Sequence, residues 1–216
     1  MNITIIGATG MVGSRLVSEA AVRGHRVTAT ARTPASYADS TIVARAVDAR
    51  VSTQVDTALS EADSVVLTVR AAAGQEHSIV AVTASLLDAV ERRQLPLLVI
   101  GGAGALRSPQ HGDKLVIDDP DYVPAEVRDI ASASLEQLNT CVEHSYRNWV
   151  YLSPPANLAP GNRTGTYRRG TTTLLTAPDG TSRISAEDLA IAAIDEIERP
   201  SGEQHITVAA GNVGAQ

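Results

Sequence analysis

The sequence predicts an α/β protein in which helices cover both faces of a parallel sheet, a doubly wound arrangement. Short runs of β-branched residues alternate with longer amphipathic segments through the first half of the chain. This alternation is typical of parallel strands joined by crossover helices. A glycine-rich loop at residues 7–13 joins the first of these runs to the first amphipathic segment. We therefore expect a buried parallel sheet whose first βαβ unit spans residues 2–31.

The individual elements follow from the same patterns. The first strand is expected at Asn2–Ile6 and the first helix at Met11–Arg23, with Gly24 as its stop before the second strand, Arg26–Ala31. Further strands are expected at Ile42–Ala46, Ser64–Thr68, Leu97–Ile100 and Trp149–Leu152, and further helices at Ser52–Ser60, Glu76–Arg93 and Ala125–His144. The sheet should therefore contain six strands in its main part.

The chain changes in character after Ser153. Prolines and glycines recur from residue 154 to residue 170, too densely for a core helix. We interpret this segment as a small C-terminal excursion on the substrate side of the sheet. Ser185 is the expected N-cap of a helix that runs through Glu198, and Gln204–Ala209 is expected to return as an edge strand.

Composition limits the classes of protein to which the chain can belong. With 216 residues and 44% hydrophobic content, residues 1–216 are expected to form one domain. A net charge of -6, with no run of basic side chains, argues against a nucleic-acid partner. No apolar stretch approaches the roughly 20 residues that span a bilayer, so we expect a cytoplasmic protein without a membrane partner. We expect the protein to be a monomer or a homodimer. The single cysteine, Cys141, is expected to be a small apolar residue on a helix.

The glycine loop predicts a dinucleotide site. In a Rossmann-type sheet, Gly7 allows the tight turn, Gly10 lets the backbone approach a pyrophosphate, and Gly13 lets the helix pack closely on the sheet. The backbone N–H groups at the start of the helix then face the anionic phosphates. The residues expected to bind the cofactor here are Gly7, Thr9, Gly10, Met11, Val12 and Gly13.

The residues after the second strand favour NADP(H). Sites selective for NAD usually carry Asp or Glu at this position, where the carboxylate accepts a hydrogen bond from the ribose 2′-hydroxyl. This chain has Arg32 there, followed by Thr33. A guanidinium pairs with a 2′-phosphate and stacks on adenine, and the threonine hydroxyl adds a donor. The alternative is that Arg32 is a solvated surface side chain.

Several segments together resemble the atypical short-chain dehydrogenase/reductase superfamily, and within it the NmrA-like group that includes biliverdin-IXβ/flavin reductases. Besides the glycine loop, with its GxxGxxG spacing, these segments are residues 31–34 (ARTP), 100–106 (IGGAGAL), 153–155 (SPP), 163–168 (RTGTYR) and 184–190 (ISAEDLA). The resemblance covers nearly the entire chain.

The resemblance and the fold imply further positions around the cofactor. Asp48 resembles the residue that meets the adenine in this superfamily, and a turn or helix-capping aspartate explains it equally well. Loops that follow the fourth, fifth and sixth strands should approach the middle and the nicotinamide end of the cofactor. The corresponding residues are Thr68, Val69, Arg70, Gly101, Gly102, Ala103, Ser153, Pro154 and Pro155.

The usual catalytic pair of short-chain reductases is missing. Those enzymes carry YxxxK on the helix before the sixth strand, whereas residues 129–134 here read DIASAS and Lys114 is the only lysine. Ala103 also stands near the position of their catalytic serine. The resemblance therefore implies an NADPH-dependent oxidoreductase that transfers a hydride to a conjugated acceptor such as a flavin or quinone, which needs no strong protein acid. The alternative is a non-catalytic NADP(H)-sensing protein that regulates a partner. A sugar-nucleotide epimerase is a weaker third reading.

The proton donor, if one is needed, remains open. Candidates are His111 and Tyr122 in the loop after the fifth strand and Tyr167 in the excursion. Each has a structural alternative: an exposed loop histidine for the first, and buried rings with satisfied hydroxyls for the two tyrosines. His77 and His144 show no ligand spacing, so we expect no metal site.

Overall fold

The fold is a doubly wound α/β sheet, as the sequence predicts. The computed structural model describes residues 1–71 and 74–211. The strands are β1 (Asn2–Ile6), β2 (Arg26–Ala31), β3 (Ile42–Ala46), β4 (Ser64–Leu67), β5 (Leu97–Ile100), β6 (Trp149–Ser153), β7 (Asn157–Ala159), β8 (Tyr167–Gly170), β9 (Arg183–Ser185) and β10 (His205–Ala210). The helices are α1 (Met11–Val22), α2 (Ser52–Ala58), α3 (Ser78–Arg93), α4 (Arg128–Glu143) and α5 (Ala186–Glu198), with 3₁₀ turns at Ala103–Ala105, Val116–Asp118 and Ala125–Val127.

Eight strands form the main sheet in the order β3-β2-β1-β4-β5-β6-β10-β8. All neighbours are parallel except β10 and β8. The expected position of the last strand is therefore wrong: β10 lies inside the sheet, and the excursion supplies the edge strand β8. With β8 added, the seven strands expected for this sheet, six in its main part and one at its edge, become eight. β7 and β9 form a separate parallel pair.

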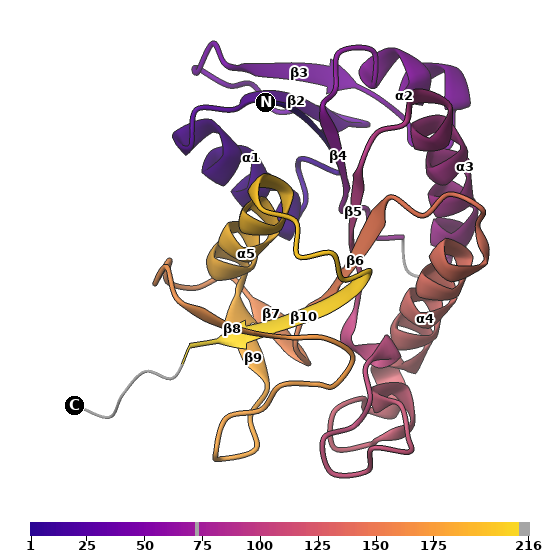
Figure 1. Ribbon diagram of the computed structural model, residues 1–216, viewed down its shortest axis with the longest axis vertical. Coiled ribbons are helices and arrows are strands. Elements are labelled where there is room, and N and C mark those ends of the chain that lie inside the picture. Colours follow the sequence, from indigo (N-terminus) through magenta and orange to yellow (C-terminus); the bar gives the residue numbers. More distant parts are fainter. Residues whose placement is uncertain (72–73, 212–216) are drawn as a thin grey trace.

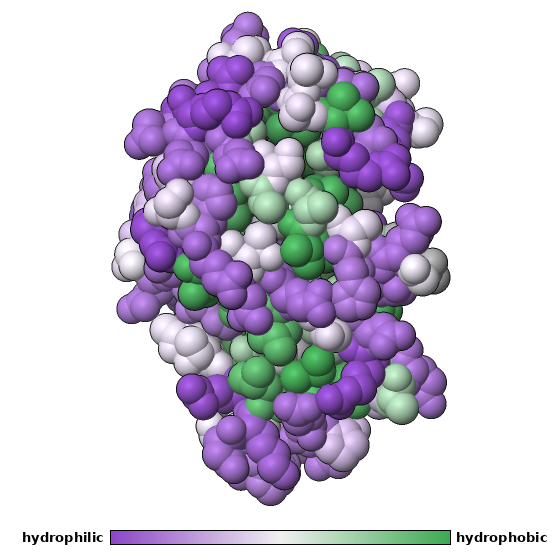
Figure 2. Space-filling view, turned by 90° about the vertical axis from the view of Figure 1, so that its right-hand side faces the viewer, coloured by the Kyte–Doolittle hydropathy of each residue, from purple (hydrophilic) through white to green (hydrophobic). Residues whose placement is uncertain are grey.

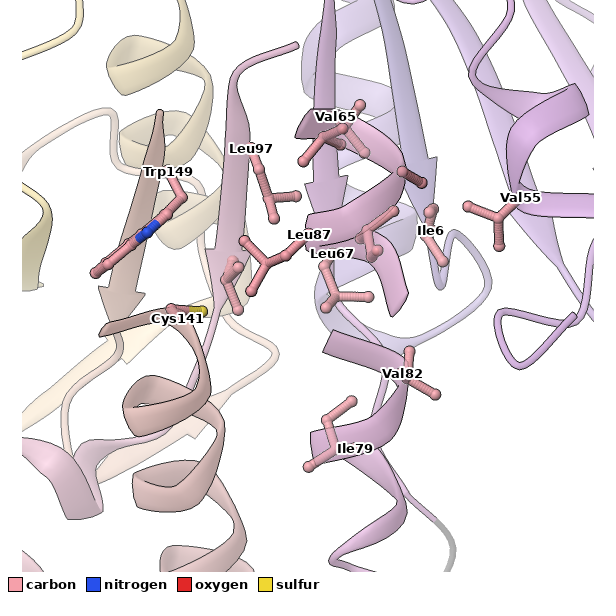
Figure 3. Close-up of a cluster of buried hydrophobic side chains, with 14 of the residues drawn as sticks. Ile6, Val55, Val65, Leu67, Ile79, Val82, Leu87, Leu97, Cys141 and Trp149 are labelled. Carbon is pink, nitrogen blue, oxygen red and sulfur yellow. The ribbon is translucent and has the colours of Figure 1, made fainter. Parts of the chain in front are cut away.

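Helices cover both faces of the main sheet, α1 and α5 on one face and α2, α3 and α4 on the other (Figure 1). On each face, a layer of apolar side chains packs between the sheet and these helices. Figure 3 shows part of the second layer, in which Cys141 of α4 and Trp149 of β6 lie beside Leu87 and Leu97. Cys141 is fully buried, and burial raises the pKa of its thiol to about 12, so it serves as a core residue as predicted.

The outer side of α4 remains in contact with solvent. Ile130 and Val142 are 44% and 49% exposed, while Ala133, Leu138 and Cys141 are buried. Figure 2 views the side of the molecule on which α3 and α4 lie, where apolar side chains are interspersed with hydrophilic ones. α4 thus buries one face only, as an amphipathic helix does. In the described part of the chain, no helix is long and apolar enough to cross a membrane.

Polar contacts hold the excursion onto the helices. Asp188, in the first turn of α5, accepts hydrogen bonds from the backbone of Thr164 (2.8 Å) and Gly165 (3.0 Å) and from the Thr164 hydroxyl (2.6 Å). Arg163 pairs with Glu19 of α1 at 3.0 Å. Ser185 caps α5 by accepting from Asp188 N at 3.0 Å, as the sequence predicts. The RTGTYR and ISAEDLA segments therefore meet each other and position the excursion.

Candidate cofactor site

The carboxyl ends of the central strands lie level with one another. The register pairs Ile6 with Leu67, Leu67 with Val99, and Val99 with Tyr151. The loops that follow β1, β4, β5 and β6 therefore emerge along one edge of the sheet. The chain order reverses between β1 and β4, and ligands of doubly wound sheets bind in the crevice at such a point.

The loop after β1 has the geometry that a phosphate cradle requires. Gly7 adopts φ +99°, and a Cβ there would lie 2.5 Å from the Thr68 carbonyl oxygen. The N–H groups of Gly7 and Ala8 both donate to the Thr30 carbonyl at 3.0 and 2.9 Å. The turn is thus held between β2 and β4, and a side chain at Gly7 would both strain the backbone and strike β4.

The other two glycines shape the start of α1. A Cβ on Gly13 would lie only 2.1 Å from the Gly7 carbonyl oxygen. The absence of a side chain at Gly13 therefore lets α1 pack closely against the glycine loop. Gly10 is the N-cap and brings no side-chain hydrogen bond, and the hydrogen bond from Ser14 N to Gly10 O (3.0 Å) closes the first turn. The N–H groups of the preceding residues, 11–13, therefore have no carbonyl of the helix to bond to.

These features fit a dinucleotide pyrophosphate. Thr9 and Gly10 are exposed at the edge of the sheet, while Val12 is 7% exposed and packs in the core between α1 and α5. Met11 is half-buried against the same core. Met11, Val12 and Gly13 thus offer backbone N–H groups rather than side chains, which is what a helix N-terminus presents to phosphate.

The ends of β2 and β3 form the next part of the site. Arg32 and Thr33 are exposed directly after β2, as expected. Asp48 accepts hydrogen bonds from Arg50, from Nη2 to Oδ2 at 2.6 Å and from Nε to Oδ1 at 2.9 Å, and its Oδ1 also accepts from Arg50 N at 3.0 Å. The structure thus shows Asp48 closing a turn, and its contact with the adenine stays a prediction. The Arg50 hydrogen bonds lower the pKa of Asp48 to about 2, and the nearby charge of Arg32 contributes.

The loop after β4 lies on the other side of the glycine loop. Thr68 and Val69 are half-buried, and Arg70 is exposed. Thr68 N donates to Ile6 O at 2.8 Å, and the Thr68 carbonyl lies 3.9 Å from the place of a Cβ on Gly10. Thr68 therefore lies directly beside the glycine loop. Val69 packs against the core on the α3 side.

The loop after β5 is pressed against α4 and β6. A Cβ on Gly101 would lie 2.0 Å from Cζ of the Tyr151 ring, and one on Gly102 would lie 2.8 Å from Ser134 Oγ. The Tyr151 hydroxyl donates to the Ser134 carbonyl at 2.7 Å, and burial raises the pKa of this phenol. Ala103 begins a 3₁₀ turn and is half-buried. The small residues of the DIASAS segment thus make room for this loop.

A buried polar group ends β6. Ser153, Pro154 and Pro155 are all buried, and Ser153 Oγ lies 2.9 Å from His205 Nε2 of β10. Burial lowers the pKa of His205 to about 4, so its imidazole is neutral near pH 7. Thr207, the register partner of Ser153, carries a buried hydroxyl with no hydrogen-bond partner among the described residues. Sequence reasoning missed His205, because only the pairing of β10 with β6 brings it to this site.

The structure does not bring the three proton-donor candidates together. His111 is exposed in the loop after β5, which a buried hydrogen bond from Ser108 to Asp119 (2.6 Å) helps to fix. Tyr122 is half-buried in a small apolar cluster on the α4 side, and burial raises the pKa of its phenol. Tyr167 packs on the opposite face and donates to Asp195 of α5 at 2.7 Å. Its hydroxyl thus has a structural partner.

One group of side chains resembles a metal site in composition. Single ligand atoms of Asp88, Glu91 and His144 lie within 4.8 Å of one another. His144 Nδ1 accepts from Tyr146 N at 3.1 Å, and His144 Nε2 lies 3.2 Å from Asp88 Oδ1. These contacts tie His144 to its neighbours at the C-terminal end of α4.

The fold and the glycine loop define a Rossmann-type dinucleotide-binding protein, and comparisons with known proteins agree. Residues 7–200 match the model of the NAD(P)H-binding family. The chain is 35% identical to the uncharacterised protein YwnB of Bacillus subtilis over 202 residues, which cover 93% of each chain. The chain therefore belongs to the NAD(P)H-binding family.

Solved structures extend this result. A Bacteroides thetaiotaomicron protein described as a candidate epimerase matches with a TM-score of 0.88 and 31% identity, covering 97% of this chain and 96% of its own. A candidate NADH-flavin reductase of Streptococcus pneumoniae matches with a TM-score of 0.88 and 27% identity, covering 98% and 100%. The expected placement among atypical, NmrA-like short-chain dehydrogenase/reductases is confirmed.

Proposed function

We propose that the protein is an NADPH-dependent reductase that transfers a hydride to a small conjugated acceptor such as a flavin or quinone. The observation that carries the cofactor half of this proposal is the uncapped first turn of α1, with Arg32 standing at the end of the neighbouring strand β2. A helix N-terminus binds the pyrophosphate, and a guanidinium suits a 2′-phosphate. Within the described part of the chain, no hydrogen bond or ion pair engages Arg32, so its guanidinium is available.

The acceptor half rests on what lies opposite the loop after β5. α4 presents Ala131 and Ser134 to this loop, and Gly104 and Gly102 pack directly on them. No phenol with a neighbouring ammonium occupies this contact. Tyr151 lies nearby, but its ring is fully buried and its hydroxyl donates a hydrogen bond to the backbone carbonyl of Ser134. An acceptor whose reduced form takes its proton from water suits such a site better than a simple ketone.

The chain's contribution is then to bind and orient the cofactor. When bound, the cofactor supplies the hydride. The backbone of residues 11–13 would hold its pyrophosphate, Arg32 would hold the 2′-phosphate, and the loops at Gly101–Ala103 and Ser153–Pro155 would flank the nicotinamide end. The S. pneumoniae neighbour, named as a candidate NADH-flavin reductase, supports acceptors of the flavin class.

The runner-up function is NADP(H) sensing without catalysis. The observation that favours it is the same contact between the loop after β5 and the small residues of α4, because a sensor needs the cradle but no acid. A partner protein whose binding responds to NADPH would support it.

The test is NADPH oxidation by the purified protein against a panel of flavins, quinones and activated carbonyls. Arg32→Ala should weaken turnover with NADPH more than with NADH. Arg26→Ala is a matched control, because Arg26 is an exposed arginine at the opposite end of β2. Tight NADPH binding without turnover of any acceptor would reject the reductase in favour of the sensor.

A further inference from the structure

The ends of β2 and β3 place a carboxylate beside the residue assigned to the 2′-phosphate. Ala31 pairs with Ala46, and Val47 N donates to Ala31 O at 2.9 Å, so the two chains leave the sheet side by side. Arg32 follows the first strand, and Asp48 follows the second after one further residue. Their charges interact, because Arg32 contributes to the lowered pKa of Asp48.

An ionised carboxylate at this place opposes binding of a 2′-phosphate. Like charges repel across a protein surface, and Asp48 lies near enough to Arg32 for the two charges to interact, so it also lies near a phosphate that Arg32 would bind. Asp48 is ionised at physiological pH with or without Arg50, since even the ordinary aspartate pKa of 3.8 lies far below that range. Taken alone, Asp48 would therefore offset much of the attraction that Arg32 exerts on the phosphate.

Arg50 removes this conflict. Its guanidinium pairs with both carboxylate oxygens of Asp48, and its backbone N–H donates to the same carboxylate. Gln54 accepts from Asp48 N at 2.8 Å and fixes the turn from the other side. Such a two-point pair is the geometry in which a guanidinium neutralises a carboxylate most completely. With Arg32, Asp48 and Arg50 counted together, the surface carries one net positive charge.

We propose that Arg50 determines cofactor specificity by neutralising Asp48, so that the ends of β2 and β3 accept a 2′-phosphate. The inference rests on the proposed preference for NADPH and adds a residue to it. Arg50 acts through Asp48 and is therefore a positioning residue. Its guanidinium pairs with the Asp48 carboxylate, and the 2′-phosphate binds to Arg32.

The experiment measures binding of adenosine 2′,5′-bisphosphate and of 5′-AMP by calorimetry, which isolates the 2′-phosphate from any catalysis. The variants are Arg50→Ala, Asp48→Asn and the double variant. Asparagine retains the side-chain carbonyl that closes the turn, so it removes charge while preserving the local backbone. Arg92→Ala is the matched control, because it removes another exposed arginine that pairs with an aspartate. Arg92 of α3 contacts Asp56 of α2 through Nη2 at 3.0 Å.

Arg50→Ala should weaken the bisphosphate about three- to tenfold at low salt and leave 5′-AMP nearly unchanged, as expected for one uncompensated charge near the surface. Asp48→Asn combined with Arg50→Ala should restore the wild-type ratio of the two affinities, and Arg92→Ala should leave that ratio unchanged. No recovery in the double variant would overturn the inference, because Arg50 would then contact the phosphate itself.

The outcome also separates this inference from the proposed function. If the wild-type protein binds the bisphosphate no more tightly than 5′-AMP, the NADPH preference fails and the role of Arg50 fails with it. If the wild type prefers the bisphosphate and Arg50→Ala keeps that preference, only the role of Arg50 is rejected. Thermal unfolding of each variant identifies any loss that comes from misfolding.

Discussion

Replacing Gly13 by alanine tests the geometry on which the cofactor site depends. The added Cβ would lie 2.1 Å from the Gly7 carbonyl oxygen, 2.9 Å from its carbonyl carbon and 3.0 Å from Ala8 Cα. All three atoms belong to the backbone of the glycine loop, so no flexible side chain can move aside. Either α1 shifts away from the sheet or the loop deforms.

Overpacking of this kind lowers the free energy of unfolding by about 1–3 kcal/mol. For a chain of this length, that corresponds to a fall in Tm of roughly 2–12 °C. Gly10→Ala provides the contrast, because its Cβ would lie 3.3 Å from the Gly7 carbonyl oxygen and 3.9 Å from the Thr68 carbonyl oxygen, with no nearer atom. The free energy of unfolding of this variant should be within about 1 kcal/mol of the wild-type value. It should bind NADPH more weakly, since Gly10 stands exposed at the start of α1, where the backbone must approach the pyrophosphate closely.

Differential scanning calorimetry gives the stabilities, and calorimetric titration with NADPH gives the affinities. Gly13→Ala should lose both stability and affinity, and Gly10→Ala should lose affinity alone. A Gly13→Ala protein as stable as the wild type, with NADPH affinity intact, would refute the packing described for α1 and the loop.

Three further outcomes follow from buried groups. Tyr151→Phe removes the donor to the Ser134 carbonyl (2.7 Å) and should lower the free energy of unfolding by about 1–2 kcal/mol in urea denaturation. Because burial lowers the pKa of His205 from 6.5 to about 4, its contribution to stability is complete above pH 6.5 and is lost as pH falls toward 4. Relative to His205→Gln, the wild type should lose on the order of 2 kcal/mol between pH 7 and pH 4.5 in urea titrations, and parallel pH curves would contradict this. Cys141 should react with a thiol reagent only after unfolding, and rapid labelling of the native protein would show that the α4 core is open.

The sequence predicts most of the sheet because its information is local. Each of the first six strands is a short run rich in β-branched or apolar residues between turn residues, and the Gly7 turn is specified by a single glycine-rich segment. The position of β10 could not be predicted this way. Its place between β6 and β8 depends on pairing with Tyr167–Gly170, a long-range contact that leaves no pattern in the residues themselves.

The candidate site also contains residues that local sequence patterns reveal and residues that only long-range pairing brings into place. Arg32 and the glycine loop are recognisable because their chemistry and their place in a βαβ unit occur together. His205 lies 52 residues from Ser153, and only the fold makes them neighbours. The partner of Asp48 was accessible in principle, since Arg50 is two residues away, but nothing in the spacing shows that the two side chains pair rather than diverge into solvent.

The central claim is that this crevice holds NADPH in preference to NADH, and calorimetric titration of the wild-type protein with each cofactor tests it most directly. We expect NADPH to bind at least about tenfold more tightly, as an added charge-assisted pair provides, with the advantage lost in Arg32→Ala and retained in Arg26→Ala. Equal affinity of the wild type for NADH and NADPH would contradict the assignment of Arg32 and with it the account of the site.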